Sequence, residues 1–247
     1  MKYKEFYNKG FQIFDNVLDD KQINFYKDNL SKIYNFQVKK FGINKIKLIG
    51  EENTVRSPFL YNYEFSKLFL SDHTKTIVRD ILGEYAILSL QNGIIVPPEK
   101  THHQSFYHRD IIHQDFTSSK PLAINIYYCL DNYNKKNGGT TFIPYSHKDE
   151  NFDIKRKEET PEIKAGSMIL FNSMIYHKAN SNTTNYSRSG INNMFSLPFI
   201  KQQINYPYCL KNKVKDKDSR RLLGYYSREF LSVEDFREYR LQRINNE

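Results

Sequence analysis

The chain of 247 residues contains no tryptophan and only two cysteines, Cys129 and Cys209. These cysteines lie far apart and neither belongs to a CxxC pair, so the sequence predicts neither a disulfide framework nor a structural zinc site. Long apolar runs are also lacking: no segment approaches the roughly 20 apolar residues of a membrane span, and the first residues contain no apolar core of a signal peptide. We therefore expect a soluble cytoplasmic protein with no membrane partner.

Acidic residues are fewer than basic ones, because 37 Lys and Arg against 28 Asp and Glu give a net charge of +9. Such a charge suits an anionic partner: nucleic acid, a membrane surface, or a small molecule that carries phosphate or carboxylate. The basic residues are interspersed with acidic ones, and no nucleic-acid-binding motif is present. We expect a small-molecule substrate and no nucleic acid partner, and a composition with 39% hydrophobic residues predicts an ordered, enzyme-like domain.

The first third of the chain, residues 1–84, is predicted to be mostly helical. Residues 21–36 carry apolar side chains at helical spacing, and residues 71–82 form a second helical segment that ends at Gly83. The expected caps are Asp19 or Asp20 for the first helix and Ser71 or Asp72 for the second. Residues 232–247 predict a further helix, with Ser232 and Asp235 in a start that resembles a capping box.

Between residues 85 and 205 the pattern changes to short runs of Ile, Val, Tyr and Phe separated by Gly, Pro, Asn and Ser. The predicted strands are 85–96, 104–110, 122–130, 140–145, 166–172, 174–179 and 189–199. So many short strands predict a sandwich or a barrel. Residues 146–165 are charged and predict a surface loop, with a lid over one barrel end as the alternative.

No linker or repeat divides the chain. We expect one domain over residues 1–247, in which 1–84 form a helical support, 85–205 a β-rich core and 206–247 a helical extension. The oligomeric state cannot be predicted from this sequence.

The pattern His-x-Asp occurs twice in the stretch YHRDIIHQDF, first as His108 and Asp110 and then as His113 and Asp115. In an extended strand, residues two apart point to the same face, so each pattern places an imidazole beside a carboxylate. These are two of the three ligands in the 2-His-1-carboxylate site of non-haem iron(II) oxygenases, which leaves three coordination positions open.

A third ligand and an anion-binding residue follow later in the chain. His177 lies in the strand-like segment MIYHKA, and Arg188 comes eleven residues later, on what should be the next strand of an antiparallel barrel. A guanidinium group there can form a two-pronged salt bridge with the distal carboxylate of 2-oxoglutarate, while the keto acid end chelates the iron. Each feature alone is a frequent accident, but the combination favours an iron enzyme.

Several segments between Ile87 and Ile204 resemble, in order, the phytanoyl-CoA dioxygenase family of iron(II)- and 2-oxoglutarate-dependent oxygenases. They are LSLQNGII, YHRD, TSSKPLAINIYYCLDNY, NGGTTFIPYSHK, AGSMILFNSMIYHKANSNTT and RSGINNMF. The NGG…IP.SHK block is the most specific of these. The resemblance implies a mainly β fold with flanking helices (α+β), built on a double-stranded β-helix, the jelly-roll or cupin-like barrel.

The two His-x-Asp pairs cannot both line the barrel if the strand stays extended through both, because they would then face opposite sides. The resemblance places His108 and Asp110 at the metal, and turn-forming residues at 118–121 place the other pair near a loop. His113 and Asp115 are then expected either to hydrogen-bond at a strand end or to contact substrate at the barrel mouth.

The resemblance also implies the chemistry. His108, Asp110 and His177 would bind iron(II), Arg188 would bind 2-oxoglutarate, and a small molecule would be hydroxylated with dioxygen, releasing succinate and CO2. Halogenation is disfavoured, because related halogenases lack the carboxylate ligand that Asp110 supplies. Further contacts to the co-substrate are suggested, each with a role in the core or a strand as the alternative, for Gln91, Asn92, Tyr107, Thr140 and Thr141.

One position departs from the family pattern: Ala179 stands where several members carry Ser or Gly, which puts one polar contact to 2-oxoglutarate in doubt. The rival from another class is a catalytically silent relative that binds a ligand or partner. The complete ligand set with Arg188 argues against it. A substrate that is anionic, sugar-linked or linked to CoA or a nucleotide is compatible with the sequence, which does not identify it.

Overall fold

The computed structural model describes residues 2–98, 105–150 and 155–244 of the chain. Its α-helices are α1 (Lys4–Lys9), α2 (Asp20–Phe41), α3 (Ile43–Leu48), α4 (Lys67–Leu70), α5 (Asp72–Leu82), α6 (Tyr206–Leu210), α7 (Lys217–Leu222) and α8 (Val233–Ile244). Three 3-10 helices are η1 (Pro58–Leu60), η2 (Tyr63–Ser66) and η3 (Ser146–Lys148). The strands are β1 (Phe11–Phe14), β2 (Thr54–Arg56), β3 (Ile87–Val96), β4 (Ala123–Cys129), β5 (Thr140–Phe142), β6 (Met168–Asn172), β7 (His177–Ala179) and β8 (Arg188–Ser196).

The two predicted helices of the first third begin at capping residues. The Asp19 carboxylate accepts a hydrogen bond from the backbone N–H of Gln22, and the Gln22 side-chain oxygen accepts one from the backbone N–H of Asp19, so α2 begins with a capping box. The Ser71 hydroxyl accepts from the backbone N–H of Thr74 at the start of α5, and Gly83 ends that helix. Both caps were among the predicted alternatives.

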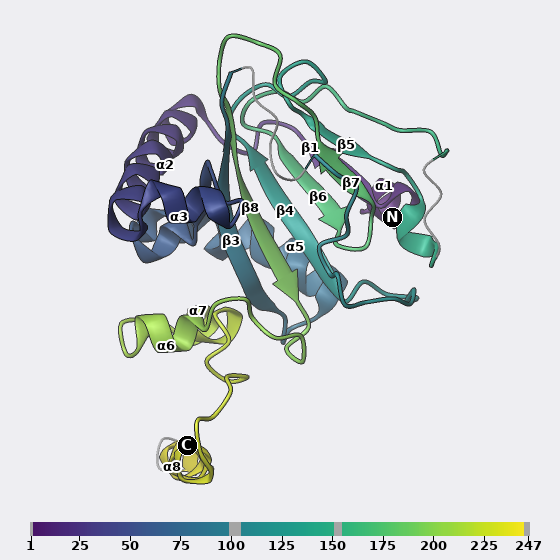
Figure 1. Ribbon diagram of the computed structural model, residues 1–247. Coiled ribbons are helices and arrows are strands. Elements are labelled where there is room, and N and C mark those ends of the chain that lie inside the picture. Colours follow the sequence, from purple (N-terminus) through teal and green to yellow (C-terminus); the bar gives the residue numbers. More distant parts are fainter. Residues whose placement is uncertain (1, 99–104, 151–154, 245–247) are drawn as a thin grey trace.

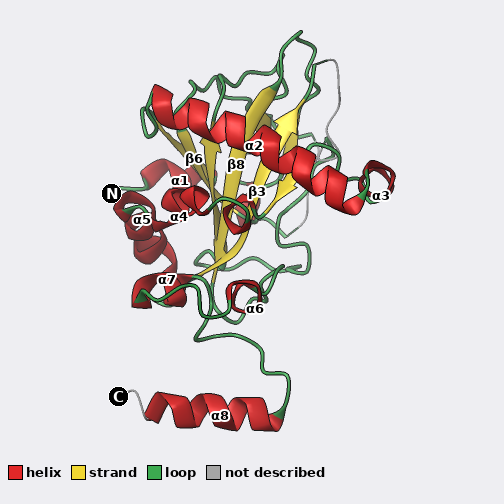
Figure 2. Cartoon of the chain, turned by 90° about the vertical axis from the view of Figure 1, so that its left-hand side faces the viewer, coloured by secondary structure: helices red, strands yellow, loops and turns green. Residues whose placement is uncertain are grey.

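Six strands form one antiparallel sheet in the order β1-β6-β4-β8-β3-β2, and β5 and β7 form a second, two-stranded sheet. The long helices α2 and α5 cover one face of the large sheet (Figures 1 and 2). The small sheet lies over the opposite face (Figure 1). The edge strands β1 and β2 come from the first third of the chain, which is therefore not wholly helical.

Alternation along the strands divides the core in two. Ile124, Ile126 and Tyr128 of β4 pack with Leu30 of α2 and Ile77 of α5 on the helix-covered face. The alternate residues of β4 and β6 lie on the face of the large sheet that points toward the small sheet. We call this the interior face, and the residues on it form a separate aromatic cluster. Its members are Phe11, Tyr127, Cys129, Tyr133, Phe142, Ile163, Ile169, Phe171 and Ile175.

One predicted strand is wrong. Gln104 lies outside the described residues, and residues 105–110 form no strand but a loop with a single isolated bridge, between His108 and His177. Strand 140–145 is also shorter than predicted, because Tyr145 adopts a left-handed conformation (φ 69°) and the chain enters η3. No helix among the described residues combines the length and the apolar character that crossing a membrane demands.

Candidate metal centre

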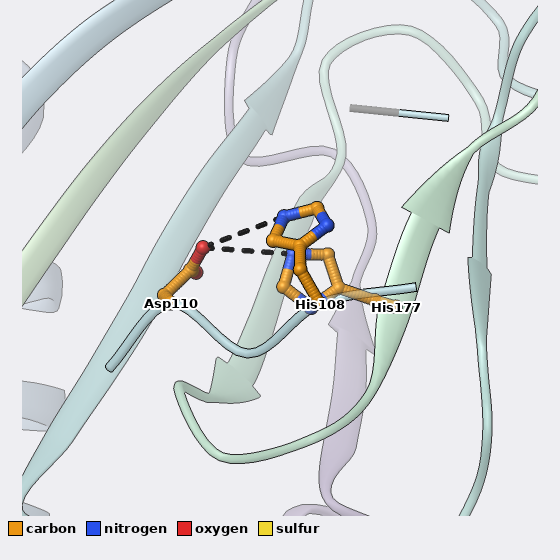
Figure 3. Close-up of side chains that lie close together, drawn as sticks. All are labelled: His108, Asp110 and His177. Atoms are coloured by element: carbon orange, nitrogen blue, oxygen red, sulfur yellow. Dashed lines mark ion pairs between the residues drawn. The ribbon is translucent and has the colours of Figure 1, made fainter. Parts of the chain in front are cut away.

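His108, Asp110 and His177 lie together on the interior side of the fold (Figure 3). The Nε2 atoms of both histidines are 3.7 Å from Oδ1 of Asp110, and the three ligand atoms all lie within 4.8 Å of one another. These separations exceed hydrogen-bonding distance. Three donor atoms that converge without bonding each other can hold a metal ion.

Backbone hydrogen bonds bring the three ligands together. The N–H of His108 donates to the carbonyl of His177 and the N–H of His177 donates to the carbonyl of His108, each at 3.1 Å. The backbone N–H of Asp110 donates to the carbonyl of Ser173 at 2.9 Å. The ligands from residues 108–110 are thus fixed onto the turn and strand that carry His177.

Arg109, between the two ligands of the first pair, fastens this loop. It is buried and donates to three backbone carbonyls, those of Met174 and Ser146 at 3.0 Å each and that of Asp149. Its guanidinium group also lies 4.2 Å from the ring centre of Tyr176. Arg109 therefore joins the ligand loop to the β6–β7 turn and to η3.

The Nδ1 atom of each histidine lies within hydrogen-bonding distance of a backbone carbonyl. Nδ1 of His108 lies 2.9 Å from the carbonyl of Phe106, and Nδ1 of His177 lies 3.0 Å from the carbonyl of Ile175. A carbonyl accepts only from a protonated Nδ1, so the neutral form of either ring has an unprotonated Nε2, which can bind a metal. Nε2 of His108 is buried and has no hydrogen-bond partner among the described residues.

Burial favours the neutral form of His177. The ring is fully enclosed and lies 5.1 Å from the ring of Phe171, and burial lowers its pKa while Asp110 opposes the change. A neutral imidazole is the ligand form, so the site needs no proton release from this ring at neutral pH.

Asp110 is oriented by an asparagine on β4. Its Oδ2 accepts a hydrogen bond of 2.7 Å from Nδ2 of Asn125, which leaves Oδ1 for the histidines. Nδ2 of Asn125 also lies 2.9 Å from the Ser173 hydroxyl, and Oδ1 of Asn125 accepts from Nδ2 of Asn192 on β8 at 2.8 Å. A chain of amides thus extends from the carboxylate across two strands of the interior face.

Arg188, the first residue of β8, is fully buried on the same face. Nη1 donates to the hydroxyls of Tyr127 and Tyr133 at 3.2 and 3.1 Å, and Nη2 donates to the carbonyl of Gly138. Burial acts to lower the pKa of Arg188, but the two tyrosine oxygens outweigh it and the pKa is raised. Gly190 lacks a side chain, which leaves space for the two tyrosines, because a Cβ would lie 2.3 Å from the Tyr133 hydroxyl.

Among the described residues, Arg188 forms no ion pair and its Nε has no hydrogen-bond partner. A buried guanidinium group bound only by neutral oxygens carries an uncompensated positive charge, which is costly unless an anion binds beside it. The arrangement can therefore hold a carboxylate.

Gln91 and Asn92 point to opposite faces of β3. The Gln91 amide lies on the helix-covered face, where it accepts from the backbone of Phe59 and donates to Phe65 and Asn193. The amide of Gln91 is thus fully hydrogen-bonded on the face away from the metal centre.

Asn92 lies on the interior face, at the strand position opposite Asn192. In the amide orientation that satisfies its neighbours, its oxygen accepts from Nη1 of Arg56 at 2.8 Å. Its nitrogen donates to the carbonyl of Gln91 at 2.9 Å in the same orientation.

Tyr107 packs beside the ligands but takes part in a charged cluster. Burial and a hydrogen bond to Glu158 raise the pKa of Tyr107, and Nζ of Lys178 lies 4.2 Å from the centre of its ring. Thr140 is half-buried, and by alternation it faces the same side of β5 as Phe142, whose ring lies 6.0 Å from that of His177. Thr141 faces the other side, with its hydroxyl 2.5 Å from that of Thr160.

His113 and Asp115 are both exposed and are not part of the cluster. The premise of an extended strand through both pairs does not hold, because residues 111–113 turn. A turn, and not strand alternation, separates the second pair from the first.

The charged segment 146–165 begins with η3, and its residues 151–154 lie outside the described part. Two residues of its later part are attached by backbone hydrogen bonds: Glu159 pairs with Phe142 of β5, and Ile163 pairs with Tyr133, which precedes β5. The described later part of this segment is therefore attached to the fold by backbone hydrogen bonds.

A family model described as phytanoyl-CoA dioxygenase (PhyH) matches residues 6–190. The chain belongs to this family. The match includes all three clustered ligands and Arg188. The phytanoyl-CoA dioxygenase family is an oxygenase family, so the resemblance on which iron(II) and 2-oxoglutarate were expected is confirmed.

Relatives and solved structures extend this assignment. An uncharacterized protein of Mycobacterium tuberculosis, Rv1501, is 28% identical over 237 residues, covering 92% of this chain and 87% of the relative. A crystal structure of EctD from S. alaskensis with bound Fe has a TM-score of 0.68 at 15% identity, covering 82% of this chain and 78% of that one. Another EctD structure, with 2-oxoglutarate and 5-hydroxyectoine, has a TM-score of 0.66 at 15% identity, covering 80% and 76%.

SnoK, a non-heme alpha ketoglutarate dependent carbocyclase from nogalamycin biosynthesis, has a TM-score of 0.62 at 13% identity, covering 78% of this chain and 82% of that one. Likeness at such identities shows the fold. The predicted jelly-roll class is confirmed, although the two sheets do not close into a continuous barrel within the described residues.

Three residues of the site were not predicted from the sequence: Arg109, Asn125 and Asn192. Asn125 left a signal, because it interrupts the apolar run AINIYYC in a fully buried strand, where a polar side chain needs a partner. Arg109 and Asn192 stand in polar segments, where no such contrast marks them.

Proposed function

We propose that this chain is an iron(II)- and 2-oxoglutarate-dependent dioxygenase that hydroxylates a small-molecule metabolite. One observation supports it above others: Nε2 of His108, Nε2 of His177 and Oδ1 of Asp110 converge, while the other polar atom of each side chain is engaged elsewhere. The donor set, two imidazoles and one carboxylate, suits non-haem iron(II) and leaves positions for other ligands.

The co-substrate would bind through Arg188. A buried guanidinium group without a counter-charge suits the distal carboxylate of 2-oxoglutarate, and its unpartnered Nε can donate to that group. Family membership and the EctD structure that contains 2-oxoglutarate support this assignment. Thr140 is proposed to line the same space, since it is two residues from Gly138, whose carbonyl already contacts Arg188.

When bound, iron(II) with 2-oxoglutarate would supply the oxidising chemistry from dioxygen, with release of succinate and CO2. The chain's own residues would orient the metal-binding side chains and exclude water from the site. Asn125 aims the Asp110 carboxylate, the carbonyls of Phe106 and Ile175 fix the two imidazoles, and the aromatic interior cluster excludes water around them.

Hydroxylation is the proposed outcome, because Asp110 supplies the carboxylate that a halogenase would lack. Substrate contacts by His113 and Asp115 stay predictions, as do the contacts of Tyr107 and Asn92 with 2-oxoglutarate.

Binding of iron(II) and of 2-oxoglutarate can be measured separately. Anaerobic calorimetric titration of the wild-type protein should show one iron(II) per chain. His177→Ala should abolish iron binding, whereas His113→Ala should leave it intact.

Arg188→Met should keep iron binding and weaken 2-oxoglutarate binding by about 10- to 100-fold, because a charge-assisted contact is lost. A folded wild-type protein that binds neither iron nor 2-oxoglutarate would instead indicate a catalytically silent relative. Retention of iron by His108→Ala and its loss in His113→Ala would place the metal at the other pair.

A further inference from the structure

Among the described residues, several buried polar side-chain atoms have no hydrogen-bond partner. Three of them belong to the metal centre, to the proposed co-substrate site or to the amide chain beside them: Nε2 of His108, Nε of Arg188 and Oδ1 of Asn192, each with less than 1 Å² of exposed surface. An unpaired polar atom in a protein interior is destabilising, so each of these atoms needs a partner that binds later. The proposed function supplies partners for the first two, the metal and 2-oxoglutarate, and leaves Asn192 without one.

The direction in which the Asn192 amide points follows from the metal ligand. A carboxylate can only accept hydrogen bonds, so Asn125 must present Nδ2 to Oδ2 of Asp110. Oδ1 of Asn125 then points to Asn192, and because this oxygen can only accept, Asn192 must donate to it through Nδ2. The Asn192 oxygen is left as the free end of the chain, and reversing this amide would bring two oxygens together.

Asn192 lies between the two halves of the proposed site. It stands four residues after Arg188 on β8, on the same interior face, roughly 13 Å away along the strand. Through Asn125 it is two hydrogen bonds from Asp110. Opposite it on β3, the Asn92 amide is already engaged by Arg56 and by the Gln91 carbonyl. No described residue donates a hydrogen bond to Oδ1 of Asn192.

We propose that Oδ1 of Asn192 is a subsite that accepts a hydrogen bond from a hydroxyl or N–H group of the primary substrate. The inference rests on the proposed function for the identity of the site. 2-Oxoglutarate cannot fill this role, because it offers only acceptor oxygens as a dianion, and dioxygen has no hydrogen to donate. The substrate class is therefore one that carries a donor group, such as a polyol, sugar or amine, in contrast to a bare hydrocarbon chain.

A high-resolution crystal structure of the whole protein, prepared without dioxygen and with iron(II) and 2-oxoglutarate, tests the orientation. Oδ1 of Asn192 should face the interior, with no donor of the chain within hydrogen-bonding distance. An inverted Asn125–Asn192 pair, or a donor from the chain itself at that oxygen, overturns the proposal. The same orientation is expected without iron, so a failure of metal binding does not obscure this result.

Binding probes test the donor requirement. The complex is titrated with glucose and ethanolamine and, as matched controls, with permethylated glucose and the O-methylated quaternary ammonium derivative of ethanolamine, neither of which has an O–H or N–H donor. Methylation should weaken binding to the wild-type protein by about 5- to 150-fold, because a buried acceptor is left unpaired. Equal affinity for a probe and its methylated form overturns the proposal. If no probe binds, the orientation in the crystal decides.

Two variants separate the acceptor from the amide chain. Asn192→Asp keeps an oxygen for the substrate but loses the donor to Asn125, so the preference for the unmethylated probe should persist. Asn192→Leu removes the acceptor, and the two affinities should become nearly equal. Both variants should still bind 2-oxoglutarate, which separates loss of this subsite from loss of the co-substrate site. A persistent preference in Asn192→Leu contradicts the assignment.

Discussion

At the scale of single residues, Asn125 is expected to set the metal affinity without touching the metal. Its Nδ2 holds the outer oxygen of Asp110 at 2.7 Å, and groups that orient a metal ligand typically contribute 10- to 100-fold in affinity. Asn125→Ala should therefore weaken iron(II) binding by about 10- to 100-fold. Competitive titration with a fluorescent chelator measures this directly.

Asn193 provides the matched control. It is equally buried, but it lies on the helix-covered face, where it binds Gln91 and the backbone of Ile126. Asn193→Ala should lower the free energy of unfolding and leave iron affinity nearly unchanged. If both variants lose iron equally, the effect arises from general destabilisation and not from orientation of Asp110.

The cluster of His108, Asp110 and His177 could be predicted from the sequence because its residue types and spacing are recognisable: a repeated His-x-Asp and a later histidine, followed by an arginine. The amides that orient them could not. Asn125 and Asn192 matter through the direction of their hydrogen bonds, which depends on which strands are neighbours in the sheet. The order β4-β8 becomes visible only in the fold.

At the scale of elements, the contact of α2 with the sheet depends on Gly93 of β3. A Cβ at this position would lie 2.1 Å from Cδ2 of Leu30 and 3.2 Å from Cβ of Val55. Gly93→Ala should therefore lower the free energy of unfolding by about 1–3 kcal/mol through overpacking. Urea denaturation followed by circular dichroism measures the change.

A double variant isolates that contact. Leu30→Ala alone should cost about 2–5 kcal/mol, because Leu30 is fully buried. In that background Gly93→Ala should be nearly neutral, since the colliding methyl group is gone. Additive losses would show that Gly93 is required for some other reason.

Elements with strong local signals were predictable. Helices α2 and α5 have capping residues and apolar spacing, and β4 and β6 consist mostly of apolar residues. The edge strands β1 and β2 were not predicted, because three or four residues are too few to establish alternation and their pairing partners lie far along the chain. The alternation within 104–110 was strong enough to predict a strand, but the prediction was wrong. This alternation places the side chains of His108 and Asp110 together and does not reflect pairing in a sheet.

At the scale of the whole molecule, His147 should make stability depend on pH. Burial lowers its pKa to about 4, and Lys148 adds to the shift. The folded chain therefore favours the neutral ring more than the unfolded chain does. This contribution is complete above about pH 6.5 and is lost as the pH falls toward 4.

The expected loss in the free energy of unfolding is at most about 3 kcal/mol between those limits. Urea titrations of the metal-free protein across this range test it. Subtracting the profile of His147→Gln removes the contributions of the other histidines, and the difference should be flat if His147 has no such role.

Elements before and after the central strands also join the main body. Tyr206 of α6 is fully buried, with its hydroxyl hydrogen-bonded to Ser57 and to the backbone of Gln91. Near the start of the chain, β1 forms an edge of the main sheet. A single domain over residues 1–247 stays our prediction, and these contacts support it as far as α6.

The isolated bridge between His108 and His177 has a kinetic consequence. Two ligands share one pair of backbone hydrogen bonds outside the regular sheet, so breaking that pair separates both imidazoles at once. Escape of a bound ion would then proceed by a single local opening and not by stepwise detachment of ligands. The residence time of the metal would then depend on how often this pair of backbone hydrogen bonds opens. Hydrogen exchange of the backbone amides of His108 and His177 should depend on the same opening rate.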